Sequence, residues 1–494
     1  MDKLLLGIDF GTSTNFVTKY DFSKKDAVPV ANMGGYGGTN IFDNNIYIQS
    51  EDNYVIGDSK KQHSDPENFF EDVKRYIVDD KKRYRVPNLN NRAVSAQDIA
   101  EMVFKSIAKK VEENENKKID GVVITVPYSY GKKYRQRLQE AATNAGLKVI
   151  RLIEEPVAAA ISYGIFGDDI KEDKKEKIAV FDLGGGTFDI TIFDFEKSDA
   201  QHAKIEVLNT DGVENLGGKT VDELLSKKFM DHLKIDYSIF SKDKERIKFQ
   251  SELNKTAKNT KELLSESDEE EIYENVSING ESKELELNVS VDGFNGWLKD
   301  NNILGKIEDA LERAVYDIDL EPEDIDRVVL AGGTSTIPII KSTVEAFFGR
   351  KSEAKKDLGE LVGHGAGILA GLSEDSSLKY TVIRKTSKNI GVARGNKFKK
   401  ILHKNTKYGE ESALMGQKLM NREASSLNVT FYEGDSAKIE DSEKIGVVKI
   451  NGKEFSSEQI YISLIREDKR DSKIKAFFYN KDKDRVFEGY LEDV

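Results

Sequence analysis

Short apolar runs and longer polar stretches alternate over roughly the first 375 residues of the chain. We expect buried strands at the apolar runs, which are Leu4–Asp9, Gly121–Val126, Lys148–Leu152, Ile178–Asp182, Phe188–Phe193 and Val328–Ala331. The intervening stretches predict helices: a polar one over 131–145 that stops at Gly146, one that Pro156 opens, and one that ends near Phe348. Alternating strands and helices are typical of an α/β protein, in which ligands bind where strands end.

The pattern changes twice further along the chain. Residues 220–320 are charged and mostly helical, with strand-like alternation near 271–293. After residue 376, apolar and polar residues alternate with period two, as at Leu427, Val429 and Phe431. We therefore expect an α/β domain at 1–375, a linker at 376–385 and an all-β sandwich at 386–494.

Composition and charge narrow the class of protein. The 494 residues include no cysteine and five histidines, so we expect no disulfide scaffold, thiolate metal site or histidine-built zinc site. Residues 1–385 carry 54 Lys and Arg against 70 Asp and Glu, whereas residues 386–494 carry 21 against 18. The acidic body argues against a nucleic-acid partner, and no apolar stretch reaches the ~18 residues of a membrane span. We expect a soluble, cytoplasmic protein that contacts neither nucleic acid nor membrane.

Two segments place an aspartate at the end of a strand, directly before a turn rich in glycine and threonine. They read IDFGTST at 8–14 and FDLGGGT at 181–187, so the aspartates are Asp9 and Asp182. Glycine lets the backbone reverse and approach a ligand, and exposed N–H groups suit phosphate oxygens. Either turn alone is equally consistent with a hairpin. Together they predict a nucleotide clamp in which the paired carboxylates hold a hydrated Mg²⁺.

A third glycine turn, LAGGTS at 330–335, leads from a strand into a helix. Its small residues leave room for a nucleobase or ribose to lie against the backbone. Close packing of the helix on the strand is the alternative interpretation, and the turn alone leaves both open.

Taken in order, these blocks resemble the ATPase superfamily of actin, sugar kinases and the 70-kDa heat-shock (DnaK-like) chaperones, and most of all the chaperone branch. The matching stretches are GIDFGTSTN (7–15), VKRYI (73–77), VVITVPYSYGKKYRQR (122–137), RLIEEPVAAAISYG (151–164), AVFDLGGGTFDITIF (179–193), NLGGKTVDELL (215–225) and VVLAGGTSTIPIIKSTVEAFFG (328–349). They follow the family's order and spacing, and the β module more weakly resembles its peptide-binding sandwich. The resemblance implies a two-lobed actin-like ATPase domain, with a duplicated ribonuclease-H-like core, followed by that sandwich.

The resemblance also implies a role for each matching residue. Lys74 would stabilise charge at the γ-phosphate, Glu155 and Asp189 would order water, and Asp182 and Thr187 would complete the catalytic set. Asp9 and Asp182 would hold the metal through water. The nucleotide-binding residues would be Asp9, Gly11, Thr12, Ser13, Thr14, Gly184, Gly185, Gly186, Thr187, Gly217, Gly218, Lys261, Ser265, Gly332, Gly333, Thr334 and Ser335. Pro127 and Arg135 would relay the nucleotide state toward the β module. Without the resemblance, Lys74 reads as an exposed helix lysine and Asp189 as an ordinary strand-face aspartate.

Several positions depart from the family pattern. In the adenine clamp, Lys258 stands where the family has a glutamate, Glu262 stands at a variable arginine position, and Thr336 replaces an arginine that lies against adenine. Gly359 replaces an aspartate near the end of this lobe, and Arg384 replaces an acid in the linker. The phosphate-binding residues match, so we expect nucleotide binding that is weaker or less selective for adenine.

These features predict an ATP-hydrolysing chaperone that uses ATP and ADP with Mg²⁺, with K⁺ as a possible second cation. Its expected partner is unfolded or extended polypeptide, and J-domain and nucleotide-exchange co-chaperones are possible further partners. No helical lid follows the β module in this sequence, which predicts fast release of polypeptide. Met415, Leu419 and Phe431 are candidates to line the peptide groove, although core packing is the favoured role for each. The alternative function is a regulatory or scaffolding protein whose β module binds one dedicated partner; a small-molecule kinase is disfavoured because it leaves this module unexplained.

Overall fold

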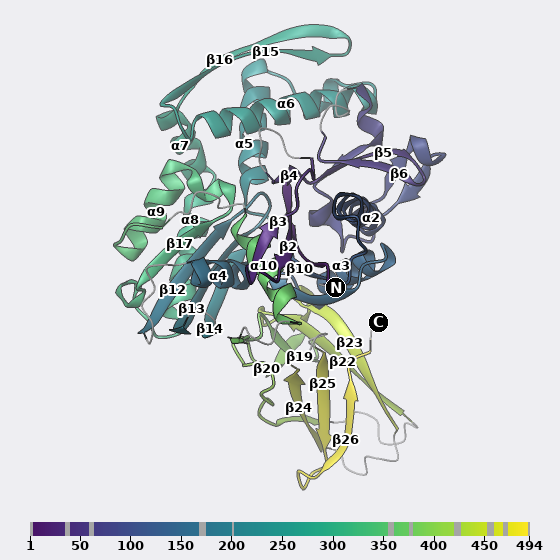
Figure 1. Ribbon diagram of the computed structural model, residues 1–494, viewed down its shortest axis with the longest axis vertical. Helices are drawn as coiled ribbons and strands as arrows, with labels where there is room; N and C mark the ends of the chain where they lie inside the picture. The colour runs from purple at the N-terminus through teal and green to yellow at the C-terminus, as the bar shows by residue number, and fades with distance from the viewer. Residues whose placement is uncertain are drawn as a thin grey trace.

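The computed structural model describes residues 3–34, 40–58, 64–166, 174–199, 202–353, 360–374, 379–418, 426–451, 459–467 and 473–492. These residues form a mixed α/β body followed by a module of β-strands, as the sequence predicts (Figure 1). Figure 1 shows the module at one end of the long axis and the β15–β16 hairpin of the body at the other end. We call strands β1 to β18 with their helices the body, and strands β19 to β26 the β module.

The first large sheet of the body has the strand order β11-β10-β1-β2-β3, and β4 pairs with β2. Its strands are β1 (Leu5–Phe10), β2 (Thr14–Asp21), β3 (Asp26–Pro29), β4 (Phe42–Asp43), β10 (Gly121–Val126) and β11 (Val149–Glu154). β1 is antiparallel to β2 and parallel to β10, so β1 and β10 end at the same edge. The helices α2 (Ala96–Glu115) and α3 (Lys132–Asn144) share one apolar core with this sheet. Smaller sheets beside it contain β5 (Asn45–Ser50), β6 (Asn53–Ile56), β7 (Phe69–Glu71), β8 (Tyr84–Val86) and β9 (Arg92–Val94).

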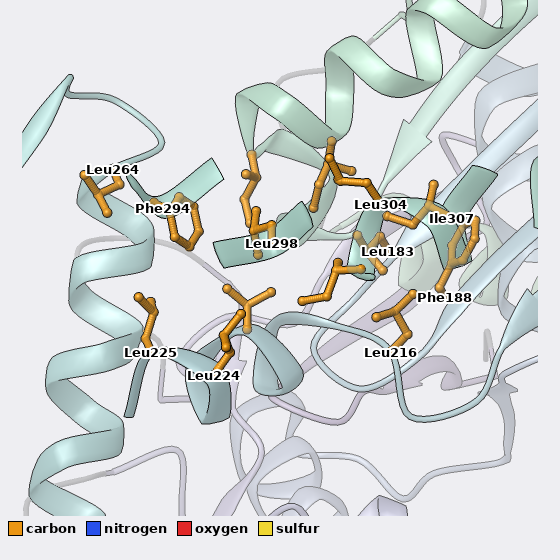
Figure 2. Close-up of a cluster of buried hydrophobic side chains, with 14 of the residues drawn as sticks. Leu183, Phe188, Leu216, Leu224, Leu225, Leu264, Phe294, Leu298, Leu304 and Ile307 are labelled. Atoms are coloured by element: carbon orange, nitrogen blue, oxygen red, sulfur yellow. The ribbon is translucent and has the colours of Figure 1, made fainter. Parts of the chain in front are cut away.

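The second large sheet repeats the arrangement of the first. Its order is β17-β12-β13-β14-β18, and β12 is antiparallel to β13 and parallel to β17. The strands are β12 (Lys174–Leu183), β13 (Phe188–Asp199), β14 (His202–Val213), β17 (Arg327–Ala331) and β18 (Lys379–Ile383). Around it lie α5 (Gly218–Leu233), α6 (Asp243–Leu263), β15 (Glu269–Ile278), β16 (Glu281–Ser290), α7 (Val291–Asp300), α8 (Ile303–Tyr316) and α9 (Pro338–Phe348). Figure 2 shows apolar side chains of α5, α7 and α8 in one cluster with Leu183, at the end of β12, and Phe188, at the start of β13.

Two helices, α4 (Glu155–Phe166) and α10 (Leu361–Leu372), pack between the two large sheets. Both are rich in small residues, and they approach so closely that a side chain on Gly365 would collide with the backbone of Ala158. Their apolar core includes Leu5 and Val123 from the first sheet and Val180 from the second. The two halves of the body are therefore joined through a tightly packed helix pair.

The β module consists of two antiparallel sheets with one shared core. The sheet β20-β19-β22-β23 contains β19 (Asn389–Arg394), β20 (Lys397–Leu402), β22 (Ser426–Gly434) and β23 (Glu443–Asn451). The sheet β21-β24-β25-β26 contains β21 (Met415–Lys418), β24 (Gln459–Arg466), β25 (Ile474–Tyr479) and β26 (Arg485–Tyr490). Phe431 lies in the core with no exposed surface and Met415 packs against that core, as their favoured role predicts, while Leu419 lies outside the described residues.

Short 3₁₀ helices complete the described elements: η1 (Pro66–Asn68), η2 (Val73–Tyr76), η3 (Pro87–Leu89), η4 (Tyr237–Ile239), η5 (Pro322–Asp324), η6 (Gly333–Thr336) and η7 (Ile439–Asp441). Part of the segment expected to be a linker forms a strand. Its residues Lys379–Ile383 form β18, which pairs in parallel with the edge strand β14 of the body. None of the described helices combines the length and the apolar character needed to cross a membrane.

Candidate functional site

The two aspartate-containing strand ends of the body meet face to face. β1 carries Asp9 into the Gly11–Thr14 turn, and β12 carries Asp182 into the Gly184–Thr187 turn. A side chain on Gly185 would collide with Ser13, and one on Gly186 would collide with Thr12, so the two turns are in direct contact. This contact explains why glycine is needed at these positions.

Open space lies beside the paired turns. A Cβ atom on Gly184 or on Gly333 would meet no atom within 4 Å. Gly333 belongs to η6, which follows β17 at the same edge of the second sheet. The structure therefore brings the three glycine turns of the sequence together, since the first contacts the second and Thr334 of the third is hydrogen-bonded to Gly184 of the second.

Hydrogen bonds fix the shape of the turns. The Asn44 side chain donates to the Gly11 carbonyl at 2.5 Å, and its backbone N–H donates to the Ser13 carbonyl at 2.7 Å. On the other side, Thr334 Oγ1 donates to the Gly184 carbonyl at 2.8 Å, which ties the third turn to the second. Within the second turn the Gly184 N–H donates to the Thr187 carbonyl at 3.1 Å, so this N–H group is used by the turn itself.

A buried lysine lies among the carboxylates of the site. Lys74 is 2% exposed, and its Nζ atom donates to Glu155 Oε1 at 2.6 Å. Lys74 lies in η2 and Glu155 begins α4, so the ion pair joins segments that are distant in sequence. Asp9 accepts a hydrogen bond from Thr125 Oγ1 at 2.6 Å, and Asp189 accepts one from the Ser129 N–H at 3.3 Å.

The carboxylates repel one another strongly. Burial, and then the Glu155 carboxylate, raises the pKa of Asp9 to about 7, although Lys74 and Thr125 lower it. Burial and Glu155 likewise raise the pKa of Asp189 to about 7. Burial raises the pKa of Asp182 well above its ordinary value, and the charges of Glu155, Asp189 and Asp9 add to the effect. The site thus concentrates more negative charge than Lys74 compensates.

This donor set fits a hydrated magnesium ion. Hard oxygen ligands are what Mg²⁺ prefers, and it usually keeps several of its own waters. Within the described ranges, no three carboxylate or imidazole groups lie close enough together to hold a metal ion by themselves. Asp9 and Asp182, which carry the uncompensated charge beside the phosphate-suited turns, therefore fit Mg²⁺ through water.

The residues that the sequence analysis expects at the nucleoside lie on α5, α6 and η6 and in the turns next to them. Gly217 and Gly218 pack against the Gly184–Thr187 turn, and a Cβ on Gly218 would lie 3.0 Å from Lys261 Nζ. Lys261 is tied to Asp222 at 2.7 Å, and Ser265 Oγ donates to the Lys261 carbonyl at 3.0 Å. In η6 the fully buried Ser335 donates to the carbonyl of Gly332, whose φ of +74° requires glycine.

The family departures lie at the rim of this region. Lys258 reaches across to Asp43 at 3.9 Å, and Glu262 is exposed. Thr336 is exposed and its hydroxyl donates to the Gly333 carbonyl within the same turn. Gly359 lies outside the described residues.

The two residues expected to relay the nucleotide state lie beside the site. Pro127 is buried directly after β10, and Arg135 on α3 donates to Glu154 at 2.9 Å and to the Tyr130 carbonyl at 3.0 Å. Glu154 ends β11 immediately before Glu155, so Arg135 contacts the residue next to the partner of Lys74.

Sequence reasoning missed four residues that shape the site: Thr125, Asn44, Asp222 and Glu154. Thr125 had a usable signal, because it is the polar residue near the end of an expected buried strand, which the structure pairs in parallel with β1. Asn44, Asp222 and Glu154 act through contacts between distant segments, which no local pattern in the sequence marks.

The fold and the site define an α/β protein in which two strand-end turns converge on an acidic centre beside a buried lysine. That arrangement suits a polyphosphate and its cation. The family model described as "Hsp70 protein" matches residues 5–463, and the chain therefore belongs to the Hsp70 family.

Curated relatives carry chaperone names. The chain is 28% identical over 413 residues to "Chaperone protein DnaK" of Thermotoga neapolitana, with 82% of this chain and 66% of that protein covered. It is 28% identical to "Chaperone protein dnaK1" of a Nostoc species, covering 91% and 66%, and 29% identical to "Chaperone protein HscA homolog" of Pseudoalteromonas atlantica, covering 82% and 64%. The matches thus span about two thirds of the relatives' length.

Proposed function

We propose that this protein is an ATP-dependent molecular chaperone, in which ATP binding and slow hydrolysis in the body control the binding of extended or unfolded polypeptide by the β module. The observation that carries the proposal is the pair of contacting glycine turns with Asp9, Asp182, Asp189 and the Lys74–Glu155 pair at their base. Membership of the Hsp70 family supports it, because its curated relatives carry chaperone names.

The proposal includes a finer assignment of the fold. The body is a two-lobed actin-like ATPase domain over 1–375, 376–385 is the interdomain linker, and 386–494 is the substrate-binding sandwich. The repeated strand arrangement of the two large sheets and the helix pair between them support the two lobes. The pairing of β18 with β14 means that part of this linker lies docked on the second lobe.

In the proposed reaction, the chain contributes positioning and charge. N–H groups of the Gly11–Thr14 turn and of residues 185–187 bind phosphate oxygens, and Lys74 stabilises the negative charge that develops at the γ-phosphate. Glu155 orients the Lys74 ammonium, and Asp189 holds the attacking water. When bound through Asp9 and Asp182, Mg²⁺ supplies neutralisation of the phosphate charge. The remaining contacts with the nucleotide are made by residues on the nucleoside side, which are Gly217, Gly218, Lys261, Ser265, Gly332, Gly333, Thr334 and Ser335.

The same proposal names the binding partners of the protein. The β module binds extended polypeptide, J-domain and nucleotide-exchange co-chaperones act on the body, and Pro127 with Arg135 passes the nucleotide state between them. K⁺ as a second cation and a cytoplasmic location stay predictions. The scaffolding alternative is not favoured, because the relatives are named chaperones.

A peptide titration tests this function. A fluorescent apolar heptapeptide is titrated into the protein with Mg²⁺, with and without ATP, and binding is followed by fluorescence anisotropy. We expect ATP to weaken peptide binding and speed its release, because the nucleotide bridges two halves of the body that contact the module. Equal affinity in both states would contradict the chaperone function.

Two variants show whether the effect arises at the proposed site. Asp182→Asn removes a carboxylate at the turn, and we expect it to abolish the ATP effect while peptide binding without nucleotide persists. Asp309→Asn, on the exposed face of α8, is the matched control and should behave as the unmodified protein does.

A further inference from the structure

The segment that carries Lys74 is tied on both sides to the helix α5. Asp72 precedes Lys74 by two residues, and its Oδ1 atom lies 3.4 Å from Lys219 Nζ at the start of α5. Arg75 follows Lys74 directly, and its guanidinium donates to Glu223 Oε1 at 3.0 Å, one turn further along α5. None of the roles assigned above to the nucleotide site includes these ion pairs.

The same end of α5 is hydrogen-bonded to the second glycine turn. The Gly218 N–H donates to the Gly184 carbonyl at 3.0 Å, and the Lys219 N–H donates to the Gly185 carbonyl at 2.8 Å. Lys219 thus contacts this turn through its backbone and the segment before Lys74 through its side chain. Because the turn and Lys74 belong to different halves of the body, Lys219 connects them directly.

The ammonium group of Lys219 lies beside two neighbouring carboxylates. Besides Asp72, its Nζ atom lies 3.6 Å from Glu71 Oε1. Burial by itself would lower the pKa of Lys219, but the charges of Glu71 and Asp72 raise this pKa above its ordinary value. Lys219 is therefore a cation at neutral pH. Without its charge, two partly buried carboxylates that are adjacent in the chain would lose the cation they share.

The backbone before Lys74 adopts a conformation that its surroundings must hold. Asp72 has a φ of +59°, in the left-handed region, which costs a residue other than glycine roughly 1–2 kcal/mol. Its side chain makes no capping hydrogen bond to η2, so η2 itself does not fix this side chain. Such a conformation persists where neighbouring groups stabilise it, and the ion pair with Lys219 is one such contact.

We propose that Lys219 is a positioning residue for hydrolysis, which holds Lys74 at a fixed place relative to the Gly184–Thr187 turn. The role rests on the proposed function, in which this turn binds phosphate and Lys74 stabilises the charge at the γ-phosphate. Misplacing a catalytic group by about 1 Å can slow a reaction by ~100-fold. Loss of the Lys219 charge should therefore slow the chemical step far more than it weakens nucleotide binding.

Single-turnover hydrolysis separates the chemical step from binding and release. Excess protein is mixed with MgATP and phosphate formation is followed, while calorimetry with MgADP gives the dissociation constant. Lys219→Met keeps a long, unbranched side chain without the charge, and we expect it to slow hydrolysis by about 10- to 100-fold while the dissociation constant changes by less than about threefold. Lys219→Arg restores the charge and should recover most of the rate. Lys227→Met, at an exposed lysine of the same helix, is the matched control and should hydrolyse ATP normally.

A double variant shows whether Lys219 acts through Lys74. Lys74→Ala removes the group that Lys219 positions, so adding Lys219→Met should change the remaining rate by less than about twofold. A general structural role, or direct contact of Lys219 with the phosphates, would give losses that add. Additive losses, an unchanged single-turnover rate in Lys219→Met, or an equal loss in Lys227→Met would each overturn the proposal.

A measurement without nucleotide keeps this role distinct from the proposed function. A nuclear magnetic resonance spectrum selective for lysine ammonium groups reports on Lys74, whose signal is the one lost in Lys74→Arg. We expect Lys219→Met to shift or broaden this signal and Lys227→Met to leave it in place. If the unmodified protein hydrolyses no ATP, the proposed function fails, and an unmoved Lys74 signal in Lys219→Met would separately overturn the positioning role.

A second variant covers the case in which Lys219→Met does not fold. Asp72→Asn removes the charge at the other end of the ion pair, and asparagine still tolerates the left-handed backbone. It should slow single-turnover hydrolysis and move the Lys74 signal in the same way. An unchanged rate together with an unmoved signal in Asp72→Asn would overturn the proposal.

Discussion

At the scale of single residues, the Lys74–Glu155 pair dominates the electrostatics of the site. Both side chains are buried, and the 2.6 Å hydrogen bond between them joins η2 to the start of α4. The neighbouring carboxylates Asp9, Asp182 and Asp189 gain their raised pKa values from burial and from the Glu155 charge. Removing the lysine therefore leaves the site without its nearest cation.

We predict that Lys74→Ala lowers the turnover number for ATP hydrolysis by roughly 100- to 1,000-fold, because one charge-stabilising donor is lost at the reacting phosphate. Steady-state phosphate release at saturating MgATP measures this. Lys81→Ala, an exposed lysine close in sequence, is the control and should hydrolyse ATP normally. Circular dichroism checks that the variant is folded, and an unchanged rate in folded protein would refute the role of Lys74.

The rim position Thr336 gives a second prediction. An arginine there would restore the cation that the family places against adenine, and such contacts contribute about 0.5–2 kcal/mol. We expect Thr336→Arg to tighten MgATP binding between twofold and thirtyfold in calorimetry. Ser342→Arg, on the exposed surface of α9, controls for general charge attraction. An equal gain in both variants would contradict a specific adenine contact.

The contact between the two turns predicts opposite behaviour for neighbouring glycines. Gly185→Ala forces a methyl group into Ser13 and should lower the free energy of unfolding by about 1–3 kcal/mol. Gly184→Ala places its methyl group in open space, so stability should stay the same while MgATP affinity falls at least tenfold. Denaturant unfolding and calorimetry measure the two effects, and identical stabilities would argue against turn–turn contact.

At the scale of elements, the crossing of α4 and α10 joins the two halves of the body. Gly365 of α10 faces the Ala158 backbone of α4 without room for a side chain. Since backbone cannot move aside as a flexible side chain can, any larger residue must separate the helices. The small residues of α10 are therefore needed for the two helices to pack closely. The sequence of α10 alone, which is simply apolar, does not indicate this need.

We predict that Gly365→Ala lowers the free energy of unfolding by about 1–3 kcal/mol or more. Gly296→Ala in α7 is the matched control, because its methyl group would meet no atom within 4 Å and alanine favours helix by up to ~1 kcal/mol. Urea denaturation followed by circular dichroism should show the two variants moving in opposite directions. A stable Gly365→Ala protein would mean that the helices do not approach so closely in solution.

At the scale of the whole molecule, lysines near the β module face carboxylates of the body edge. The ion pairs are Lys388–Glu214 at 3.0 Å, Lys404–Asp211 at 3.2 Å and Lys407–Glu206 at 2.7 Å. Their sign agrees with the sequence, in which an acidic body precedes a slightly basic tail. Such partly exposed pairs orient the module on the body.

A double-mutant cycle on Glu206→Gln and Lys407→Gln measures the strength of one of these pairs. We expect a coupling of about 0.2–1 kcal/mol in the docking equilibrium at low salt. It should vanish near 1 M salt, where the screening length is only ~3 Å. A larger coupling energy that persists in high salt would contradict the description of this pair as a weak, partly exposed ion pair.

The pH dependence of the same pair has a defined sign. The hydrogen bond from Lys407 holds the pKa of Glu206 below its ordinary value. The stabilisation that this pair gives to docking is therefore complete at any pH above the ordinary pKa of a glutamate. It is lost as the pH falls through the lowered pKa of Glu206. The coupling energy between Glu206 and Lys407 in the docking equilibrium should therefore stay constant between pH 8 and pH 5. A change in the coupling within that window would contradict the assignment.

Much of the fold follows from local pattern. The strand Gly121–Val126 was predicted with its exact bounds, and helix α3 to within a residue at each end, because a long apolar run and clear stop signals leave few alternatives. The linker was less predictable: Lys379–Ile383 has a weak apolar pattern, and it forms a strand only because the edge of β14 is available to pair with it.

The sequence by itself determined which residues are candidates for the chemistry, since Asp9, Asp182 and the glycine turns need only their own strand ends to be recognised. Tertiary structure decided which of them meet. The contact of Ser13 with Gly185, the burial of Lys74 against Glu155, and the hydrogen bond from the Lys132 N–H to Glu433 all join segments far apart in the chain. Such contacts depend on packing and on the compensation of buried charge, which act between distant residues and leave no local periodicity to read.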